Sequence, residues 1–423
     1  KCRRGQLDQP LAIAWLKRFI TDNAPRPTVR RVPITRKEKI AIVGAGPAGL
    51  TAAHDLALRG YAVEVFEELP KPGGMMRYGI PAYRLSREVI DAEIADIAEL
   101  GVTIHTGIRV GKDISFDDLL SSHDRILLAT GAHRSLPLRI PGEDLQGVMG
   151  AVEFLRAVNL DKPPAIGKRV VVIGGGNTAL DAARTARRLG AEEVRVLYRR
   201  ERSDMPAWEQ EIEAALAEGV LIDCMVSPVC CEGSGDKVTQ IICQRMQAAE
   251  FDSSGRRRSV PIPGSEYALA ADLVISAVSQ STDISFVPET AGIATAIQGT
   301  ICCRPQNSTR TSHERVYAAG DAVLGPATVV EAIAAGHQAA RDIDEDIRNY
   351  NREPPWQEKD IEKIDIPFEV DEETISRPRI AMPELPVRER TRSFAEVELG
   401  YDRDSAWREA CRCQRCDGNQ GKG

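Results

Sequence analysis

The chain has 423 residues, 55 of them basic and 62 acidic, which gives a formal net charge of −7. An acidic chain of this kind lacks the clustered positive surface that nucleic-acid binding needs, and no apolar run reaches the ~20 residues of a membrane span. Single cores stop growing at roughly 250 to 300 residues, so we expect two or three domains, in a cytoplasmic protein whose ten cysteines are mostly reduced.

The first residues predict a short helix and a linker. Apolar residues recur at helical spacing from Leu7 to Ile20, within a predicted helix over 6–22. The stretch "NAPRPTVRRVP" (23–33) is rich in proline and arginine, so it cannot continue the helix. We therefore interpret residues 1–36 as a helical piece and a linker.

A βαβ unit with a glycine turn follows. The apolar run "KIAIV" enters "GAGPAG" (44–49), a helix continues to Gly60, and "YAVEVFEE" is the next strand. In such a turn the glycines allow a tight bend, close approach of a pyrophosphate, and close helix packing, and the helix N-terminus attracts phosphate. An acid about twenty residues on binds the ribose hydroxyls. The candidate residues are Gly44, Gly46, Pro47, Ala48, Gly49 and Glu67.

The βαβ pattern is repeated from "RVVVI" to "EEVRVLYRR", with an alanine allowed at the third turn position. The second strand ends on arginines instead of an acid. Because guanidinium groups bind a 2′-phosphate bidentately, this favours NADP over NAD. If the arginines instead form a solvated face or salt bridges, NAD remains open. The candidate residues are Gly174, Gly175, Gly176, Asn177, Thr178, Ala179, Arg199, Arg200 and Arg202.

Two further strands end in glycine turns. "RILLATGA" (125–132) contains Thr130 and Gly131, and "VYAAGDAV" (316–323) precedes a helix "TVVEAIAAGHQAARDI". After Asp346 the chain becomes rich in proline and charge, which predicts an extended arm.

Together, "GAGPAGL", "VFEELPKPGGMMRYGIPAYRL", "ATGA", "VVVIGGGNTALDAAR", "YRRERSDMPA" and "VYAAGDAVLGPATVVEAIAAG" resemble the small subunit of NADPH-dependent glutamate synthase and related flavin subunits of iron–sulfur redox complexes. The resemblance covers roughly residues 38–343. It implies an α/β fold of two Rossmann-like dinucleotide-binding domains, with the FAD domain interrupted by the NAD(P) domain. The implied parts are a helical remnant and linker (1–36), the FAD domain (37–165 and 286–345), the NAD(P) domain (166–285) and a partner-binding arm with a Cys-rich end (346–423).

The resemblance also adds FAD contacts that the first turn alone does not give. A helix N-terminus near the flavin ring would stabilise negative charge on the reduced ring. Asp321, taken alone, is equally typical of a helix cap. The added residues are Gly73, Gly74, Arg77, Thr130, Gly131, Gly320, Asp321, Ala327 and Thr328.

The chain departs from its family at its ends. Members often begin with a Cys-rich domain that holds two iron–sulfur clusters, and the first residues here, with Cys2, resemble the end of that domain. "CRCQRC" supplies Cys411, Cys413 and Cys416, and Cys2 would complete the four thiolates of one iron–sulfur cluster. A cluster shared with a partner, a zinc site or a reduced tail are the alternatives. Ser279 also replaces a glycine that is common near the NAD(P) site.

The function expected from the resemblance is electron transfer. The adjacent pairs Cys230–Cys231 and Cys302–Cys303 have a strained spacing for disulfides, so thiol–disulfide exchange is disfavoured. We expect an FAD-containing subunit of a hetero-oligomer that exchanges hydride with NAD(P)H without a catalytic acid or base. Its partner would hold iron–sulfur clusters, as in an aldehyde oxidoreductase, formate dehydrogenase or hydrogenase complex. The alternatives are a glutamate synthase small subunit and a non-catalytic nucleotide-binding assembly module.

Overall fold

The computed structural model describes residues 2–6, 8–251, 257–296, 299–305, 308–354 and 377–413. Contacts divide the chain into two units. We call Val29–Pro355 with Val387–Ala395 the body, and Lys1–Thr28, Trp356–Pro386 and Glu396–Gly423 the terminal unit.

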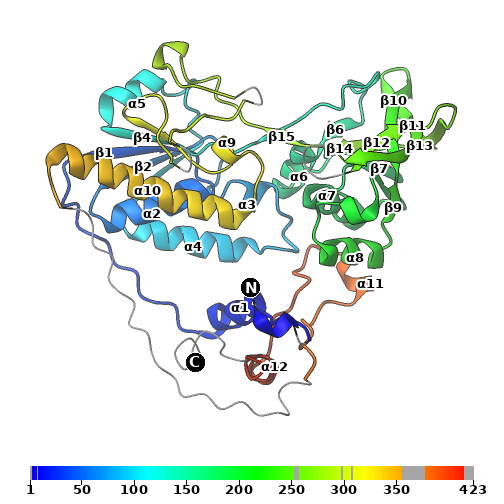
Figure 1. Cartoon of the computed structure of the whole chain (residues 1–423), viewed down its shortest axis with the longest axis horizontal. Helices are drawn as coiled ribbons and strands as arrows, with labels where there is room; N and C mark the ends of the chain where they lie inside the picture. The colour runs from blue at the N-terminus through cyan, green and yellow to red at the C-terminus, as the bar shows by residue number, and fades with distance from the viewer. Residues whose placement is uncertain are drawn as a thin grey trace. The chain divides into compact units, whose positions relative to one another are not determined.

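The first sheet of the body has five parallel strands made from β-branched and aliphatic runs. Its spatial order is β16 (Val316–Ala318), β4 (Arg125–Leu128), β1 (Lys39–Val43), β2 (Ala62–Glu67) and β3 (Thr103–Thr106). Helices α2 (Pro47–Leu58), α4 (Arg87–Glu99) and α10 (Val329–Asn351) lie on one face of it (Figure 1). The remaining elements around this sheet are α3 (Met75–Tyr78), α5 (Phe116–Ser122), η3 (Glu289–Ala291) and α9 (Asp321–Leu324).

Helix α10 packs along α2, and Gly336 makes this close approach possible. A Cβ added at Gly336 would lie 2.4 Å from the Ala48 carbonyl oxygen. The helix continues to Asn351, five residues beyond the point where the sequence predicted an extended arm to begin. Its buried Ile347 and Arg348 explain the difference, because they join its last turn to the body.

The second sheet is also parallel, in the order β6 (Val148–Gly150), β14 (Leu273–Ser276), β7 (Arg169–Ile173), β8 (Glu193–Tyr198) and β9 (Leu221–Cys224). Helices α6 (Ala151–Asn159), α7 (Asn177–Arg188) and α8 (Glu209–Ala217) pack against it, and the turn after β8 contains η2 (Arg202–Asp204). An antiparallel sheet covers its other face, formed by β10 (Val226–Ser234), β11 (Lys237–Phe251), β12 (Arg257–Pro261) and β13 (Tyr267–Ala270).

Strand β6 lies within residues 37–165, which the sequence assigned to the first nucleotide domain. It pairs with β14 of the second sheet, and α6 packs in the same core as α7. The chain passes between the two sheets where β5 (Arg134–Ser135) pairs with β15 (Gln280–Ser281). The second sheet therefore includes residues that precede the expected boundary at 166.

The terminal unit joins the two ends of the chain. Helix α1 (Ile13–Asn23) packs with α12 (Arg403–Ala410), and the buried Glu409 carboxylate accepts hydrogen bonds from the Ala12 and Ile380 N–H groups at 2.8 and 2.9 Å. A short 3-10 helix, η1 (Arg3–Gln6), precedes α1, and α11 (Val387–Arg390) belongs to the body. The predicted N-terminal helix thus starts at Ile13 instead of residue 6, and part of the expected arm is helical.

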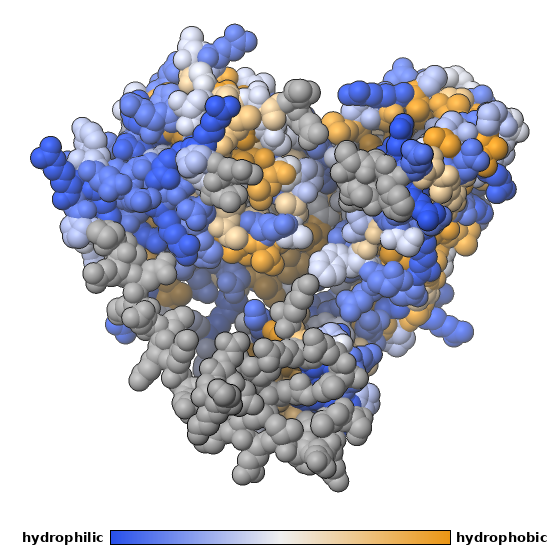
Figure 2. Space-filling model, in the orientation of Figure 1, coloured by the Kyte–Doolittle hydropathy of each residue, from blue (hydrophilic) through white to orange (hydrophobic). Residues whose placement is uncertain are grey.

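Hydrophilic and hydrophobic residues are interspersed over the face of the molecule in Figure 2. Of the helices within the described ranges, none has both the length and the apolar character to cross a membrane.

Candidate nucleotide-binding sites

A cavity lies over the first glycine turn, with about 1090 Å³ free of protein atoms in and above it. It collects segments from the carboxyl ends of β1, β2, β4 and β16, the edge where α/β sheets bind ligands. The sequence-predicted residues that line it are Gly44, Gly46, Pro47, Ala48, Glu67, Gly74, Thr130, Gly131, Gly320, Asp321, Ala327 and Thr328.

Glu67 supports the turn and also faces the cavity. Its carboxylate accepts hydrogen bonds from the Ala45 N–H at 2.8 Å and the Leu69 N–H at 2.9 Å. Burial raises the pKa of Glu67, and the two N–H groups oppose that effect. A carboxylate offers about four acceptor positions, so Glu67 can still accept ribose hydroxyls.

Three predicted FAD residues do not line the cavity. A Cβ added at Gly49 would lie 2.1 Å from the Gly44 carbonyl oxygen, which is the close helix packing expected of the third glycine. The Gly73 N–H donates to the Ala45 carbonyl at 2.8 Å. Arg77 donates to the Pro72 carbonyl at 2.6 Å and to Asp91. Arg77 therefore holds the loop, and its expected FAD contact stays a prediction.

The opposite wall of the cavity is formed by the starts of α9 and α10. Burial raises the pKa of Asp321 to about 6, against the effect of a hydrogen bond from the Ala327 N–H. Thr328 caps α10, since its hydroxyl accepts from the Glu331 N–H at 3.3 Å. The positive end of this 23-residue helix thus lies at the cavity, as the resemblance implies.

The cavity also has lining residues that were not among the predicted FAD contacts. Arg109 follows β3 and lies 3.6 Å from both Glu68 and Asp283. Its place after a parallel strand was a usable signal, whereas Asp283 is recruited from distant sequence. The additional lining residues include Phe66, Glu68, Leu69, Met75, Ile108, Arg109, Val110, His133, Asp283 and Phe286.

Two polar atoms at the cavity indicate that a ligand belongs there. Thr130 Oγ1 and His133 Nδ1 are buried and have no hydrogen-bond partner within the part of the chain that the structure describes. Buried polar atoms are nearly always paired, and an unpaired one costs about 1–3 kcal/mol. A dinucleotide with its hydroxyls, phosphates and ring heteroatoms would supply partners, so the residues present fit FAD.

His133 gives a prediction about acid stability. Burial and the nearby Arg156 lower the pKa of His133 from 6.5 to about 4. Between those pH values the unfolded chain binds a proton that the folded chain does not, so folding stability falls by roughly 3 kcal/mol as pH drops through this window. We expect His133→Gln to lose less thermal stability than the parent chain between pH 7 and pH 4.5, measured by scanning fluorimetry. His54→Gln, at a more exposed histidine, is the control; equal slopes for His133→Gln and the parent would refute the assignment.

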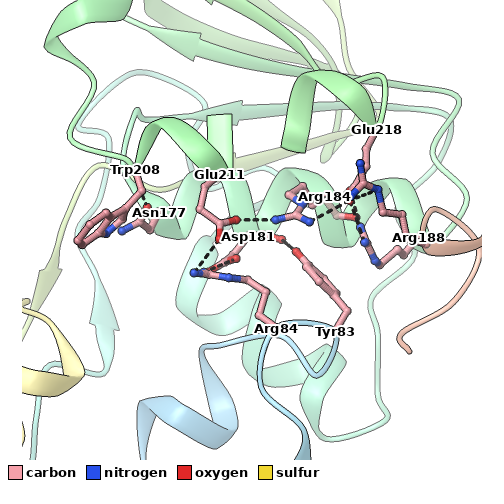
Figure 3. Close-up of polar contacts among 10 residues, drawn as sticks. Tyr83, Arg84, Asn177, Asp181, Arg184, Arg188, Trp208, Glu211 and Glu218 are labelled. Carbon is pink, nitrogen blue, oxygen red and sulfur yellow. Dashed lines mark hydrogen bonds and ion pairs between the residues drawn. The ribbon is translucent and has the colours of Figure 1, made fainter. Parts of the chain in front are cut away.

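The second glycine turn has the same geometry at the end of β7. The Gly174 N–H donates to the Leu197 carbonyl at 3.0 Å, Gly176 caps α7, and Ala179 is fully buried. Gly175 and Thr178 lie in the same turn and first helical turn. The Asn177 amide oxygen accepts from the Trp208 N–H at 3.1 Å, which fixes the segment after β8 beside the turn (Figure 3).

The three arginines after β8 have different surroundings. Arg199 is exposed at the end of the strand, without an ion pair to any residue described, and Arg200 is half-buried beside it. Arg202 is bound to Glu209 at 2.6 Å and to Glu213. The salt-bridge interpretation therefore holds for Arg202, Arg199 remains a candidate for the 2′-phosphate, and the predicted role of Arg200 stays a prediction.

Ser279 and the cysteines were the other open points. The backbone at Ser279 is not left-handed, so a side chain is tolerated there. Cys411 and Cys413 are exposed and Cys2 is half-buried, while Cys416 lies outside the described residues. Among the residues that are described, no three potential metal ligands come together. The iron–sulfur cluster stays a prediction.

Comparison with known proteins places these features in context. A family model described as pyridine nucleotide-disulphide oxidoreductase matches residues 38–336. The beta subunit of an NADP(+)-dependent formate dehydrogenase from Moorella thermoacetica is 42% identical over 98% of this chain and 63% of its own length. The small chain of glutamate synthase [NADPH] from Escherichia coli is 36% identical over 79% of this chain and 74% of its own.

The fold has a counterpart among solved structures. Mycobacterium tuberculosis FprA in complex with NADPH superposes with a TM-score of 0.65, at 24% identity, over 75% of this chain and 86% of that one. Identity this low shows a shared fold and nothing finer. The chain also spans less than two thirds of the length of the formate dehydrogenase subunit.

Proposed function

This chain belongs to the pyridine nucleotide-disulphide oxidoreductase family, and from that premise we propose that it is an FAD-containing, NADP(H)-dependent electron-transfer subunit of a larger redox complex. Membership in the family confirms the resemblance and the two-domain α/β fold expected from the motifs. The observation that carries the proposal is the pair of glycine turns, one followed by Glu67 and the other by Arg199 and Arg200.

The two sites would hold different nucleotides. Residues of the first cavity bind FAD, with Glu67 at the ribose and the start of α10 near the ring. The second turn binds the pyrophosphate of NADP(H), with Arg199 and Arg200 at the 2′-phosphate. When bound, FAD supplies hydride exchange with the nicotinamide and release of electrons one at a time. The protein's task is to bind, orient and shield both groups.

Thiol chemistry does not fit the second domain. Burial raises the pKa of Cys231 to about 11 and of Cys243 to about 12, so neither is a thiolate at neutral pH. Thiolates, not thiols, attack disulfides. Electrons from the flavin would therefore leave to a partner, for which iron–sulfur clusters are the one-electron acceptors we propose.

A formate dehydrogenase type of complex is favoured over glutamate synthase. The formate dehydrogenase subunit matches 98% of this chain, whereas the glutamate synthase small chain matches 79%. Of these two matches, only the one to the formate dehydrogenase subunit extends over most of the N-terminal and C-terminal segments of this chain. These segments include the terminal unit. We propose that this unit binds the partner.

Anaerobic titration of the purified chain tests the proposal. We expect a yellow protein whose flavin absorbance is bleached by one equivalent of NADPH and far more slowly by NADH. Iron analysis of the isolated chain and of the intact complex then locates the clusters. A colourless chain, or bound FAD that NADPH leaves oxidised, would exclude the function, and four irons per isolated chain would assign a cluster to this subunit instead of its partner.

A further inference from the structure

The segment Gly73–Arg84 ("GGMMRYGIPAYR") runs from the first nucleotide site to the second. Its first residues lie against the first glycine turn. The Gly73 N–H donates to the Ala45 carbonyl at 2.8 Å, and a Cβ added at Gly74 would lie 2.7 Å from Gly46 Cα. The start of the segment therefore follows any movement of that turn.

The end of the segment is fixed to helix α7, which starts at the second glycine turn. Arg84 Nη1 donates to both carboxylate oxygens of Asp181 at 2.9 Å. The Tyr83 hydroxyl donates to the Asp181 backbone carbonyl at 3.4 Å. Figure 3 shows both side chains directed at this one residue of α7, one turn beyond Asn177. Asp181 is 5% exposed, so the carboxylate of this ion pair is buried.

A second layer of charges fixes the other side of this contact. Glu211 of α8 bridges Arg84 and Arg184 at 3.0 and 2.5 Å. Arg188 lies 3.7 Å from the centre of the fully buried Tyr83 ring, which favours a cation–π contact. Each charge is paired, as buried ions must be for the arrangement to be stable. Tyr83 and Arg84 thus pack against charged residues of α7 and α8 in the second domain (Figure 3).

The middle of the segment is held as well. The Asn159 side chain of α6 donates to the Tyr78 carbonyl at 3.0 Å. Arg87, just after the segment, donates to the Met76 and Ile80 carbonyls and to Asn159 at 2.8–2.9 Å. With both ends and the middle fixed, Gly73–Arg84 is a rigid spacer between the two turns.

We propose that Gly73–Arg84 is a positioning element that sets the distance between the two bound nucleotides, with the Arg84–Asp181 ion pair as its decisive contact. This inference rests on the function proposed above. Hydride exchange needs the reacting atoms about 3–3.5 Å apart, and a misplacement of 1 Å costs on the order of 10²-fold in rate. Because the NADP pyrophosphate sits on α7, a shift of this helix moves the nicotinamide relative to the flavin.

Stopped-flow reduction of the FAD-loaded chain by NADPH tests the role. We expect R84Q and D181N to lower the limiting rate of flavin reduction at saturating NADPH by on the order of 10- to 100-fold. FAD content, the dissociation constant for NADP+ and reoxidation of dithionite-reduced protein by ferricyanide should not change. R84K, which keeps the charge but loses the bidentate fork, should fall between R84Q and the parent chain.

D223N is the matched control, since Asp223 of β9 pairs with Arg195 of β8 at 2.7 Å, within the second sheet. A limiting rate in R84Q equal to that of the parent would overturn the proposal, as would a loss confined to NADP+ affinity. If R84Q does not retain FAD, the limiting rate of flavin reduction in R84K tests the proposal instead. A rate in R84K equal to that of the parent chain would then overturn the proposal. A parent chain that NADPH does not reduce would instead refute the proposed function.

Discussion

Alanine at the two turn glycines is expected to separate the two nucleotide sites. Gly44 has φ +104° and Gly174 has φ +145°, and a Cβ at either would lie 2.4 Å from a backbone carbonyl oxygen, of Ala129 and Ala277 respectively. We expect Gly44→Ala to purify without FAD, because its turn must open to admit the methyl group. Gly174→Ala should stay yellow but resist bleaching by NADPH. Flavin absorbance per chain, before and after anaerobic NADPH, measures both.

Two other glycines provide controls for backbone strain. Gly107 has φ +71° and Gly190 has φ +99°, and a Cβ at either would meet no atom within 4 Å. Alanine there imposes a similar backbone strain without the collision. Both control variants should bind FAD and respond to NADPH. Full FAD content in Gly44→Ala, or rapid bleaching of Gly174→Ala, would contradict the assignment of the turns.

The glycine turns could be predicted from sequence because they are local. Strand, turn and helix follow one another within some twenty residues, and each glycine is required by a backbone approach inside that unit. Glu67 follows from the same spacing. Its second task, accepting the Ala45 and Leu69 N–H groups, needed the folded turn to be recognised.

Residues recruited across the chain were not predictable in this way. In the sequence, Asp181 is one polar residue among several on a predicted helix. The fold brings it into contact with Arg84, which lies 97 residues earlier in the chain. Arg77 matched a family contact, yet its guanidinium is used by Pro72 and Asp91. For Asp181 the partner comes from a distant part of the sequence, and for Arg77 the predicted FAD contact stays a prediction.

Composition predicts only part of the structure of the C-terminal arm. Proline and charge predicted an extended segment after residue 346, but residues 377–413 include α12, whose Glu409 is fully buried. The Arg412 guanidinium binds this carboxylate at 2.7 Å. Charged residues here are buried beside the apolar cluster of Ala12, Tyr401 and Ala406 instead of being exposed to solvent.

Replacing Arg199 by glutamine is expected to shift the nucleotide preference. A hydrogen bond to a charged group contributes about 1.5–3 kcal/mol, so losing a guanidinium from the 2′-phosphate should lower kcat/KM for NADPH by roughly 10- to 100-fold. The value for NADH, which has no 2′-phosphate, should change by less than about threefold. Steady-state kinetics with ferricyanide as acceptor and each nucleotide in turn measure both values.

Arg202→Gln is the control that the structure provides for this test. Its guanidinium is already bound to Glu209 and Glu213, so its removal should leave the NADPH preference near that of the parent chain. The sequence alone ranked the three arginines together, and the two carboxylates on α8 distinguish Arg202 from Arg199. A larger loss for NADPH in Arg202→Gln than in Arg199→Gln would mean that Arg202 leaves these acids for the phosphate when NADP binds.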